Sequence, residues 1–579
     1  MVQLVSGSPP HPVEDRGASA PLWTAFARAV RTGAVVREPL AGRAVALDAL
    51  LSGAERTATQ VLHTMAVDGT VAADRLPSRL GLLMANGEPW LRALFSAFRL
   101  GAAVVPLATP ATSSDLDAYC RHLRRIATDA DLDAILIDDS VRRVAPALRA
   151  GLPGLPVIDV ADVPAQPASA DLPGAPEATG TAIVQYTSGS TSAPKGVVLS
   201  HRNVLAGLTS LAVGAEWTDG DSMGMWLPLF HDMGLFLTLS ALLHGSPVTL
   251  WRPSDFIRRN GAWLQSFAAS RTTAAPAPNF AYDYLVRRAR QDGVPDGVDL
   301  SAWRLAYNGA EPVHAATIEE FQATFGRYGF RPEAMFPCYG LAEATLAVTF
   351  PTPGRPPRYR HLDRTLLDPG ERVRDVPAGA PQARAVVALG HAAPGLRLRV
   401  AAGDTPLAGE VVGEVQVRGP AVTAGYLRRP AEEQPFTADG WLRTGDAGFV
   451  DGDDLFVVGR LTDRVIVRGQ NYYPEDVEEV VRAMPGVDRR RCAALSVTHD
   501  RHESMLVLVE THQDRPAAER LAARVRAGVV GALGLDAVEV VTVPPRTIPF
   551  TSSGKVRRRA ARQLYERHEC AGQPRALAE

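Results

Sequence analysis

Residues Tyr186 to Gly196, YTSGSTSAPKG, form a run of side chains that could hold a phosphate group. Every residue after the tyrosine is Gly, Ser, Thr, Pro, Ala or Lys. Hydroxyl groups bind phosphate oxygens, a glycine lets the backbone approach, and a lysine adds positive charge. The residues that we expect to contact phosphate are Thr187, Ser188, Gly189, Ser190, Thr191 and Lys195. Taken alone, the run is equally compatible with an exposed Ser/Gly hairpin.

The run does not fit the Walker loop, GxxxxGK(S/T). Counting from Gly189, Pro194 stands where that motif needs glycine, and Gly196 stands where it needs a hydroxyl group. A proline has no backbone N–H to offer to a phosphate. The residues that follow, GVVLS, include two β-branched valines and predict a strand rather than the start of a helix. We therefore predict a strand, a flexible loop and a second strand.

Further motifs follow along the chain. They are PLFHDMG (228–234), NGAEP (308–312), YGLAEAT (339–345), WLRTGD (441–446), GRLTDRVIVRG (459–469) and TSSGK (551–555). In this order and at this spacing they resemble the adenylate-forming enzymes, which include acyl-CoA synthetases, peptide-synthetase adenylation domains and luciferases. The stretches QYTSGSTSAPKGV, HDMGL, APNFAYD, YNGAEPV and YGLAEATL are most similar to the fatty acyl-AMP ligases. The resemblance covers about residues 50 to 565 and is poor before about residue 55.

The resemblance implies a two-step reaction. A carboxylate oxygen attacks the α-phosphorus of ATP and releases pyrophosphate, and the acyl group then passes to a carrier-protein thiol. Because two anions must meet, the site must supply positive charge and hold the reactants in line. The loop from Thr187 to Lys195 would close on the β- and γ-phosphates, and Glu343 would reach Mg²⁺ directly or through water. A surface helix carboxylate is the alternative for Glu343.

The nucleoside part of ATP would be held by three of the motifs. Asp446 would accept hydrogen bonds from the ribose hydroxyls, with support from Arg460. A salt-bridged turn is the alternative for this pair. The adenine slot would be formed by Asn308, Gly309, Ala310, Glu311, Tyr339, Gly340 and Leu341, with the Tyr339 ring stacked on the base.

The carboxylic acid substrate would enter the site beside His231, because the resemblance places this residue where the acyl carboxylate binds. A histidine beside apolar residues can also be a satisfied core residue. The residues implied to line the acyl pocket are Phe230, Met233, Phe280 and Tyr282. An enzyme that activates amino acids would need an acidic partner for the ammonium group. The nearby stretches FLTLSALLHG (236–245) and APNFAYDYL (277–285) are mainly apolar and aromatic, and Asp283 is the only acid among them. An apolar tunnel for an acyl chain fits better.

Lys555 lies in a glycine-containing loop before a basic helix, and the resemblance makes it the catalytic lysine of a small mobile domain. Asp463 matches the hinge of that domain. The small domain would rotate after adenylation to admit the thiol. The helix arginines, Arg557–Arg559 and Arg562, could be a solvated face or could dock an acidic carrier protein.

Two alternative functions stay open. An acyl-CoA synthetase of the same fold would use free CoA. Residues 351–385 are polar and rich in arginine, and acyl-AMP ligases carry an extra segment about here that is associated with poor use of CoA. A non-catalytic scaffold is less consistent with the joint presence of Lys195, Glu343, Asp446, Arg460 and Lys555.

Secondary-structure elements must hold these residues in place. Over most of the chain, short β-like runs alternate with stretches whose apolar residues recur at helical spacing. This alternation predicts an α/β fold with mainly parallel strands. We expect a large N-terminal AMP-binding domain over residues 1–461. Short alternating strands over about residues 385–458 predict a small β-barrel-like subdomain. We expect residues 462–579 to form the small α+β domain.

The composition of the chain excludes several classes of protein and indicates a cellular compartment. The 579 residues carry a net charge of −2, and this argues against a nucleic-acid binder. The four cysteines show no metal-ligand spacing. No secretory signal and no apolar run of ~18 residues, the length that spans a bilayer, is found. We expect a cytoplasmic enzyme without a membrane span.

Overall fold

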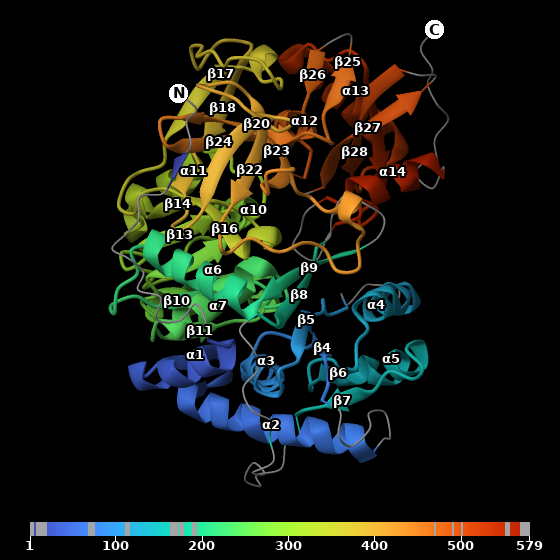
Figure 1. The fold of residues 1–579 in the computed structure, drawn as a ribbon. Helices are drawn as coiled ribbons and strands as arrows, with labels where there is room; N and C mark the ends of the chain where they lie inside the picture. The colour runs from blue at the N-terminus through green and yellow to red at the C-terminus, as the bar shows by residue number, and fades with distance from the viewer. Residues whose placement is uncertain are drawn as a thin grey trace.

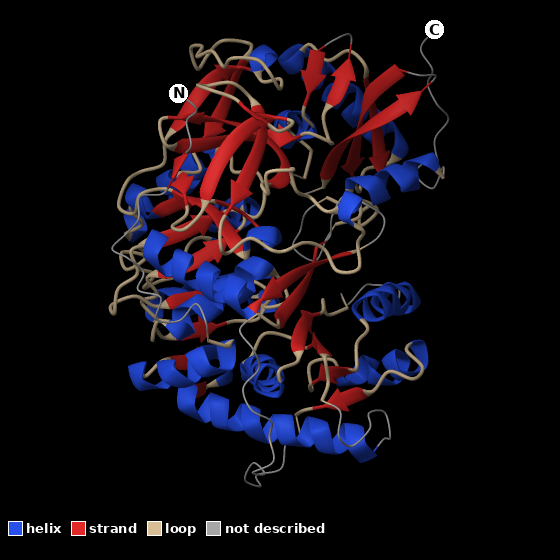
Figure 2. Cartoon of the chain, in the orientation of Figure 1, coloured by secondary structure: helices blue, strands red, loops and turns tan. Residues whose placement is uncertain are grey.

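The computed structural model describes residues 5–6, 20–67, 76–110, 116–161, 172, 179–187, 194–467, 470–488, 491–499, 502–550 and 556–567. Figure 1 shows the α/β part of the chain in the lower and middle regions, antiparallel strands above it, and the C-terminal elements at the upper right. Figure 2 shows that helices and strands alternate through the α/β part. The predicted α/β class is confirmed.

A six-stranded sheet contains the two strands that flank the predicted phosphate-binding run; this antiparallel pair, Thr181–Thr187 and Lys195–Ser200, is called the phosphate hairpin below. The order of the sheet is β7 (Val157–Asp159), β6 (Ala134–Ile137), β4 (Arg79–Leu83), β5 (Ala103–Pro106), β8 (Thr181–Thr187) and β9 (Lys195–Ser200). All neighbours are parallel except β8 and β9. The apolar runs of β5 and β6 are buried at every residue, as expected for parallel strands that are covered on both faces.

A seven-stranded sheet carries the motifs of the acid and adenine sites. Its order is β14 (Met335–Pro337), β13 (Leu305–Asn308), β12 (Ala274–Ala277), β10 (Met223–Met225), β11 (Val248–Leu250), β2 (Val35–Glu38) and β3 (Arg43–Ala46). Only the β2–β3 pair is antiparallel. One cluster of buried apolar residues extends from Leu22 to Ala421 and includes residues of both sheets.

Helices complete the α/β part. They are α1 (Leu22–Ala29), α2 (Leu47–Val67), α3 (Glu88–Leu100), α4 (Leu116–Ala130), α5 (Ala145–Gly151), α6 (His201–Gly214), α7 (Asp232–Leu243), α8 (Pro253–Arg258), α9 (Asn260–Ala269), α10 (Asn279–Asp292) and α11 (Ala315–Phe325). Helix α7, DMGLFLTLSALL, has apolar residues on every face, and it is buried from Met233 to Leu242. The region before about residue 55, where the resemblance is poor, also packs into the core. The ring of Phe26 in α1 lies edge-on against that of Phe95, with the ring centroids 4.9 Å apart.

The antiparallel part lies about where the small subdomain was expected. Its main sheet has the order β1 (Val5–Ser6), β20 (Arg397–Ala402), β22 (Gly413–Arg418), β23 (Leu442–Asp451) and β24 (Asp454–Arg460), with β21 (Thr405–Pro406) on β20. Smaller sheets pair β15 (Tyr339–Leu341) with β16 (Leu346–Phe350) and β19 (His391–Ala392), and β17 (Tyr359–Asp363) with β18 (Ala383–Val387). The strands that are described do not close into a barrel, because the main sheet runs from β1 to β24 without a return.

The C-terminal region, defined here as residues 462–567, has the predicted α+β composition. It contains β25 (Val465–Val467), β26 (Gln470–Tyr472), α12 (Pro474–Arg482), β27 (Cys492–His499), β28 (His502–Glu510), α13 (Arg515–Leu533), β29 (Val538–Val543) and α14 (Arg558–Glu566). Strands β27, β28 and β29 form one sheet, and two clusters of buried apolar residues belong to this region alone. Among the described helices of the chain, none is both long and apolar enough to cross a bilayer.

Candidate active site

The phosphate run joins the antiparallel strands β8 and β9, with Thr187 opposite Lys195 in the register. This confirms the two predicted strands, and residues 188–193 between them are not described. Ser188, Gly189, Ser190 and Thr191 lie outside the described residues. The Nζ of Lys195 lies 5.0 Å from the centroid of the Tyr426 ring, a distance at which a cation and an aromatic face attract each other.

Tyr426 also contacts the expected metal ligand. Glu343 lies in the 3₁₀ turn η6 (Ala342–Ala344), and its Oε1 accepts a hydrogen bond of 2.8 Å from the Tyr426 hydroxyl. Burial raises the pKa of Glu343, and the Tyr426 hydrogen bond lowers it by less. One tyrosine therefore joins the lysine of the phosphate hairpin to the carboxylate of a motif about 150 residues downstream.

Sequence reasoning missed Tyr426, because it belongs to none of the motifs. Its position depends on pairing across the chain: it forms an antiparallel bridge with Val197 of β9, and the N–H of Leu427 donates to the Gly196 carbonyl at 2.8 Å. The nearby sequence signal, a glycine followed by an aromatic residue, is too common to identify a site.

The ribose motif forms a second polar group. Asp446 and Arg460 face each other in the register of β23 and β24, and the Arg460 Nε donates to Asp446 Oδ1 at 2.9 Å. The Tyr339 hydroxyl donates to the other carboxylate oxygen at 2.5 Å. Asp446 is 8% exposed. Its two oxygens are therefore fixed by an arginine and a tyrosine, and the Tyr339 ring is held by its hydroxyl.

The two halves of the adenine motif lie side by side. The Cys338 N–H donates to the Asn308 carbonyl at 2.9 Å. A Cβ on Gly309 would lie 2.8 Å from the Cys338 carbonyl oxygen, and one on Gly340 would lie 1.9 Å from the Leu346 carbonyl oxygen. Both positions therefore need glycine for the backbone segments to approach each other.

Two further residues of the motif have placements that the sequence did not indicate. Ala310 has a φ of +66°, in the left-handed region. Glu311 Oε1 accepts the backbone N–H of Phe280 at 2.5 Å, in the first turn of α10. The Glu311 carboxylate thus holds the start of a helix, and this favours a structural role over direct contact with adenine.

The acid motif is tied to the phosphate hairpin. His231 precedes α7, is half-buried, and its ring lies 4.7 Å from that of Phe230. The Phe230 carbonyl accepts a hydrogen bond of 2.9 Å from Gln185 Nε2 of β8, two residues before Thr187. The start of α7 is therefore fixed to the strand that leads into the phosphate loop.

The expected acyl-pocket residues do not share one environment. Phe280 is half-buried and Met233 is buried at the start of α7. Tyr282 has no exposed surface; its hydroxyl donates to the Tyr307 carbonyl at 2.8 Å, and its ring packs edge-on against Phe321 at 5.0 Å. These contacts favour a core role for Tyr282 rather than a lining role.

Comparisons with known proteins show the family to which the chain belongs. Residues 75–427 match the AMP-binding enzyme family. The long-chain-fatty-acid–AMP ligase FadD26 of Mycobacterium marinum is 33% identical, over 84% of this chain and 87% of its own. The chain is a member of the fatty acyl-AMP ligase family.

Other similar proteins carry related names. The medium-chain-fatty-acid–acyl-carrier-protein ligase JamA of Moorena producens is 33% identical, over 84% of this chain and 85% of its own. A solved fatty acyl-adenylate ligase, from work on the E. coli and L. pneumophila enzymes, superposes with a TM-score of 0.85 at 28% identity, over 96% of this chain and 98% of that one. The fold is thus that of this family of adenylate-forming ligases.

In this fatty acyl-AMP ligase, the polar segment of residues 351–385 contains a strand and contributes to a buried apolar cluster. Strand β17 of the segment pairs with β18, which begins at its end, and Leu362, Leu367 and Val373 are buried in one cluster with Phe449 and Phe456. Although its sequence is polar and rich in arginine, the segment therefore contributes to this buried cluster. Its apolar residues are spaced too widely to predict a strand.

The arginines of the segment divide into two groups. Arg358 pairs with Asp451 at 3.1 Å and with Asp454 at 2.9 Å, within the antiparallel part. Arg360 likewise pairs with Asp375 at 2.5 Å. Arg364 instead donates to the Ala532 carbonyl of the C-terminal region at 3.4 Å.

Two more contacts join this part of the ligase to the C-terminal region. The Nε of Arg384 in β18 lies 2.7 Å from Asp476 Oδ1 in α12, and both side chains are largely buried. The Tyr473 hydroxyl donates to the Leu367 carbonyl at 3.4 Å. Residues 351–385 therefore lie directly against the C-terminal region.

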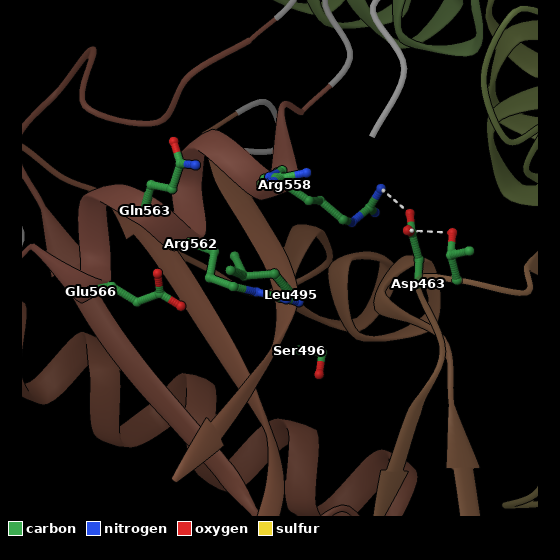
Figure 3. A pocket seen from close by; sticks show the side chains of 9 residues that line it. Asp463, Leu495, Ser496, Arg558, Arg562, Gln563 and Glu566 are labelled. Carbon is green, nitrogen blue, oxygen red and sulfur yellow. Dashed lines mark hydrogen bonds and ion pairs between the residues drawn. The ribbon is translucent and has the colours of Figure 1, made fainter. Parts of the chain in front are cut away.

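The expected hinge is also an ion-pair site. Asp463 Oδ2 lies 3.6 Å from the Nη1 of Arg558 in α14 (Figure 3). Burial raises the pKa of Asp463, although Arg558 lowers it in part. Lys555, the expected catalytic lysine, lies outside the described residues.

Proposed function

We propose that the chain activates a fatty, or similarly apolar, carboxylic acid with ATP to give acyl-AMP and pyrophosphate, and then transfers the acyl group to the phosphopantetheine thiol of a carrier protein. The relatives FadD26 and JamA, named for ligation of fatty acids to AMP and to an acyl carrier protein, support this substrate class. Lipid, polyketide or lipopeptide biosynthesis would use such a product.

The observation that carries the proposal is the convergence of three motifs in one electrostatic environment. Glu343 is bound by Tyr426, which also faces Lys195. The pKa of Glu343 is lowered by Arg460 of the ribose pair and raised by Asp232 beside His231. Residues of the phosphate, ribose and acid motifs therefore influence one carboxylate, which is consistent with the close approach of ATP and acid that attack on the α-phosphorus requires.

The residues present fit a Mg²⁺ ion that arrives with ATP. The described residues include no cluster of three or more His, Cys, Asp or Glu side chains that could hold a metal alone. Magnesium usually binds one or two carboxylates and completes its shell with water and substrate phosphates. Glu343 would supply the protein ligand, and the ion would neutralise phosphate charge.

Within this site, Asp446 and Arg460 would bind the ribose, and the backbone around Gly309 and Gly340 would lie along adenine. His231 would orient the acyl carboxylate at the start of α7. Phe230, Phe280 and Met233 are apolar and border the motifs of the acid site. Each buried methylene contributes ~0.8 kcal/mol, so affinity should rise with acyl length until the pocket ends.

A carrier protein is the favoured acceptor because residues 351–385, which include Arg384 of β18, contact the C-terminal region. These contacts would disfavour the particular arrangement of that region in which an acyl-CoA synthetase uses CoA, rather than all movement of the region. We propose that residues 462–579 act as a separate small domain, which turns about Asp463 and brings Lys555 into the site for adenylation only. Because ATP and carrier proteins meet in the cytoplasm, we place the enzyme there.

Pyrophosphate release tests the proposed substrate class. The purified protein is incubated with ATP and Mg²⁺, together with fatty acids of increasing length, aromatic acids or amino acids. We expect release that climbs with acyl length to a limit and is poor with amino acids. Robust release with a free amino acid, and none with medium- or long-chain fatty acids, contradicts the proposal.

A further inference from the structure

Residues 227–231, called the acid turn below, follow strand β10 and lead into helix α7. The turn is buried up to Leu229, whereas Phe230 and His231 are half-buried. It stands at the carboxyl end of a parallel strand, which is the usual place for a ligand in an open α/β sheet. The conformation of the acid turn therefore decides where the His231 side chain stands relative to the phosphate hairpin.

The inner end of the acid turn is anchored by Asn86, which follows β4 of the six-stranded sheet. Its Nδ2 donates to the carbonyls of Leu227, at 2.8 Å, and of Trp251, at 3.1 Å, and its Oδ1 accepts the Leu229 N–H at 2.9 Å. Asn86 is 6% exposed, and both the nitrogen and the oxygen of its amide have partners. Residues 227–229 are therefore held without help from the phosphate hairpin.

The outer end of the acid turn is held by one side chain of the phosphate hairpin. The Nε2 of Gln185 in β8 donates to the Phe230 carbonyl at 2.9 Å, one residue before His231. Because side chains alternate between the two faces of a strand, Gln185 lies on the same face of β8 as Thr187. Gln185 thus links the residue that precedes His231 to the strand that leads into the phosphate run.

The other half of the Gln185 amide has no bond to account for its presence. The side chain is 4% exposed, and its Oε1 is buried without a hydrogen-bond partner among the described residues. A buried polar atom that is left unpaired destabilises a fold. Stability alone therefore does not explain a glutamine at this position. What it supplies, and an apolar side chain of similar length does not, is the hydrogen bond that orients Phe230.

We propose that Gln185 is a positioning residue of the carboxylate subsite: through the Phe230 carbonyl it sets the place of His231 relative to the phosphate hairpin. This inference rests on the proposed function, in which His231 orients the acyl carboxylate. Because the carboxylate must meet the α-phosphorus in line, a small displacement of His231 lowers the rate. Since Asn86 holds residues 227–229, loss of the Gln185 bond moves the outer end of the turn and leaves the fold intact.

Gln185→Met tests the inference, because methionine has a similar length and no N–H to donate. We expect kcat/KM for the fatty acid, measured by pyrophosphate release at saturating ATP, to fall about tenfold or more. The KM for ATP should stay close to the wild-type value, because the pairing of β8 with β9 is kept. The melting temperature should change little, since removal of the unpaired Oε1 offsets the loss of a donor to Phe230.

Gln185→Glu adds a pH profile that a merely structural residue would not give. A carboxyl group donates to the Phe230 carbonyl only while it is protonated, and burial raises the pKa of a carboxyl group. The rate of the variant relative to the wild type should therefore be highest at low pH and should fall as the carboxyl group ionises. The control is Gln265→Glu in α9, at an exposed residue whose amide donates to the Asp296 carbonyl at 3.5 Å. Its relative rate should not depend on pH.

Three results overturn the inference: wild-type kinetics with the fatty acid in Gln185→Met, a rise in the KM for ATP as large as that for the acid, or a relative rate of Gln185→Glu that does not change with pH. Failure of both variants to fold also overturns it, because Gln185 would then serve stability alone. The wild type decides the proposed function separately. No pyrophosphate release with any fatty acid contradicts that function, whereas release that is unaffected by both substitutions contradicts only the role of Gln185.

Discussion

Two tyrosine hydroxyls, those of Tyr339 and Tyr426, each donate to a carboxylate of the candidate site. Each carboxylate is thereby kept in a fixed orientation before any substrate arrives. Sequence reasoning identified both carboxylates and Tyr339 from their motifs. It could not identify Tyr426, because the contact with Glu343 exists only after residues 424–427 pair with β9.

Tyr426→Phe separates the two contacts of this side chain. The ring that faces Lys195 stays, but the hydrogen bond to Glu343 is lost. A hydrogen bond to a charged group contributes ~1.5–3 kcal/mol, so kcat/KM for MgATP should fall roughly 10–100-fold.

The same substitution should change the pH profile. The Tyr426 bond lowers the pKa of Glu343, and its removal should raise that pKa further above its usual range. Because the ionised carboxylate binds Mg²⁺, activity on the acid side should be lost at higher pH in the variant than in the wild type. An unchanged acid limb, measured as kcat/KM against pH, contradicts the assignment of Glu343.

Lys195→Ala should raise the KM for ATP without unfolding the protein. A phosphate contact of this kind contributes ~1.5–3 kcal/mol, or roughly 10–100-fold. Among the described residues the Lys195 ammonium group contacts the Tyr426 ring, and a cation–π contact that keeps access to water contributes only ~0.5–1 kcal/mol. The melting temperature should therefore change little. A variant that unfolds, or one that keeps full activity, excludes Lys195 from the phosphate site.

At the scale of elements, the strands around the phosphate run were predictable because their β-branched residues flank a loop with a proline. Strands β17 and β18 were not, because their buried residues stand among arginines and aspartates that pair with each other. The main antiparallel sheet was predictable as short strands, but its open shape depends on pairing between residues far apart in sequence.

Arg384→Ala tests the contact between β18 and the C-terminal region. It removes the ion pair with Asp476 and leaves that carboxylate largely buried. We expect docking of the C-terminal region to weaken and acyl-CoA formation with free CoA to rise about tenfold or more, equivalent to ~1.4 kcal/mol.

The matched control is Arg358→Ala, since the ion pairs that Arg358 forms with described residues lie within the antiparallel part. Equal CoA use by both variants and the wild type would exclude this contact as a barrier. Point substitutions are preferable to shortening residues 354–375, because that deletion would remove β17 and the buried Leu362.

At the scale of the whole molecule, the proposed cycle moves Lys555 between two half-reactions. Removing one preorganised charge at a transition state costs ~3–4 kcal/mol, or roughly 10²–10³ in rate. Lys555→Ala should therefore lose adenylate formation by about this factor, but should transfer acyl groups from supplied acyl-AMP at a nearly normal rate. Single-turnover kinetics of each step measure this, and an equal loss in both steps contradicts the moving domain.

The central claim is that a fatty acid passes through acyl-AMP to a carrier protein rather than to CoA. Mass spectrometry tests it most directly, on the wild-type protein with ATP, Mg²⁺ and a fatty acid, in matched time courses with either CoA or a holo carrier protein. We predict acyl-AMP in both reactions, and acyl-carrier protein without appreciable acyl-CoA. Acyl-CoA formed as fast as the acyl-carrier protein, or no acyl-AMP with any fatty acid, contradicts the account.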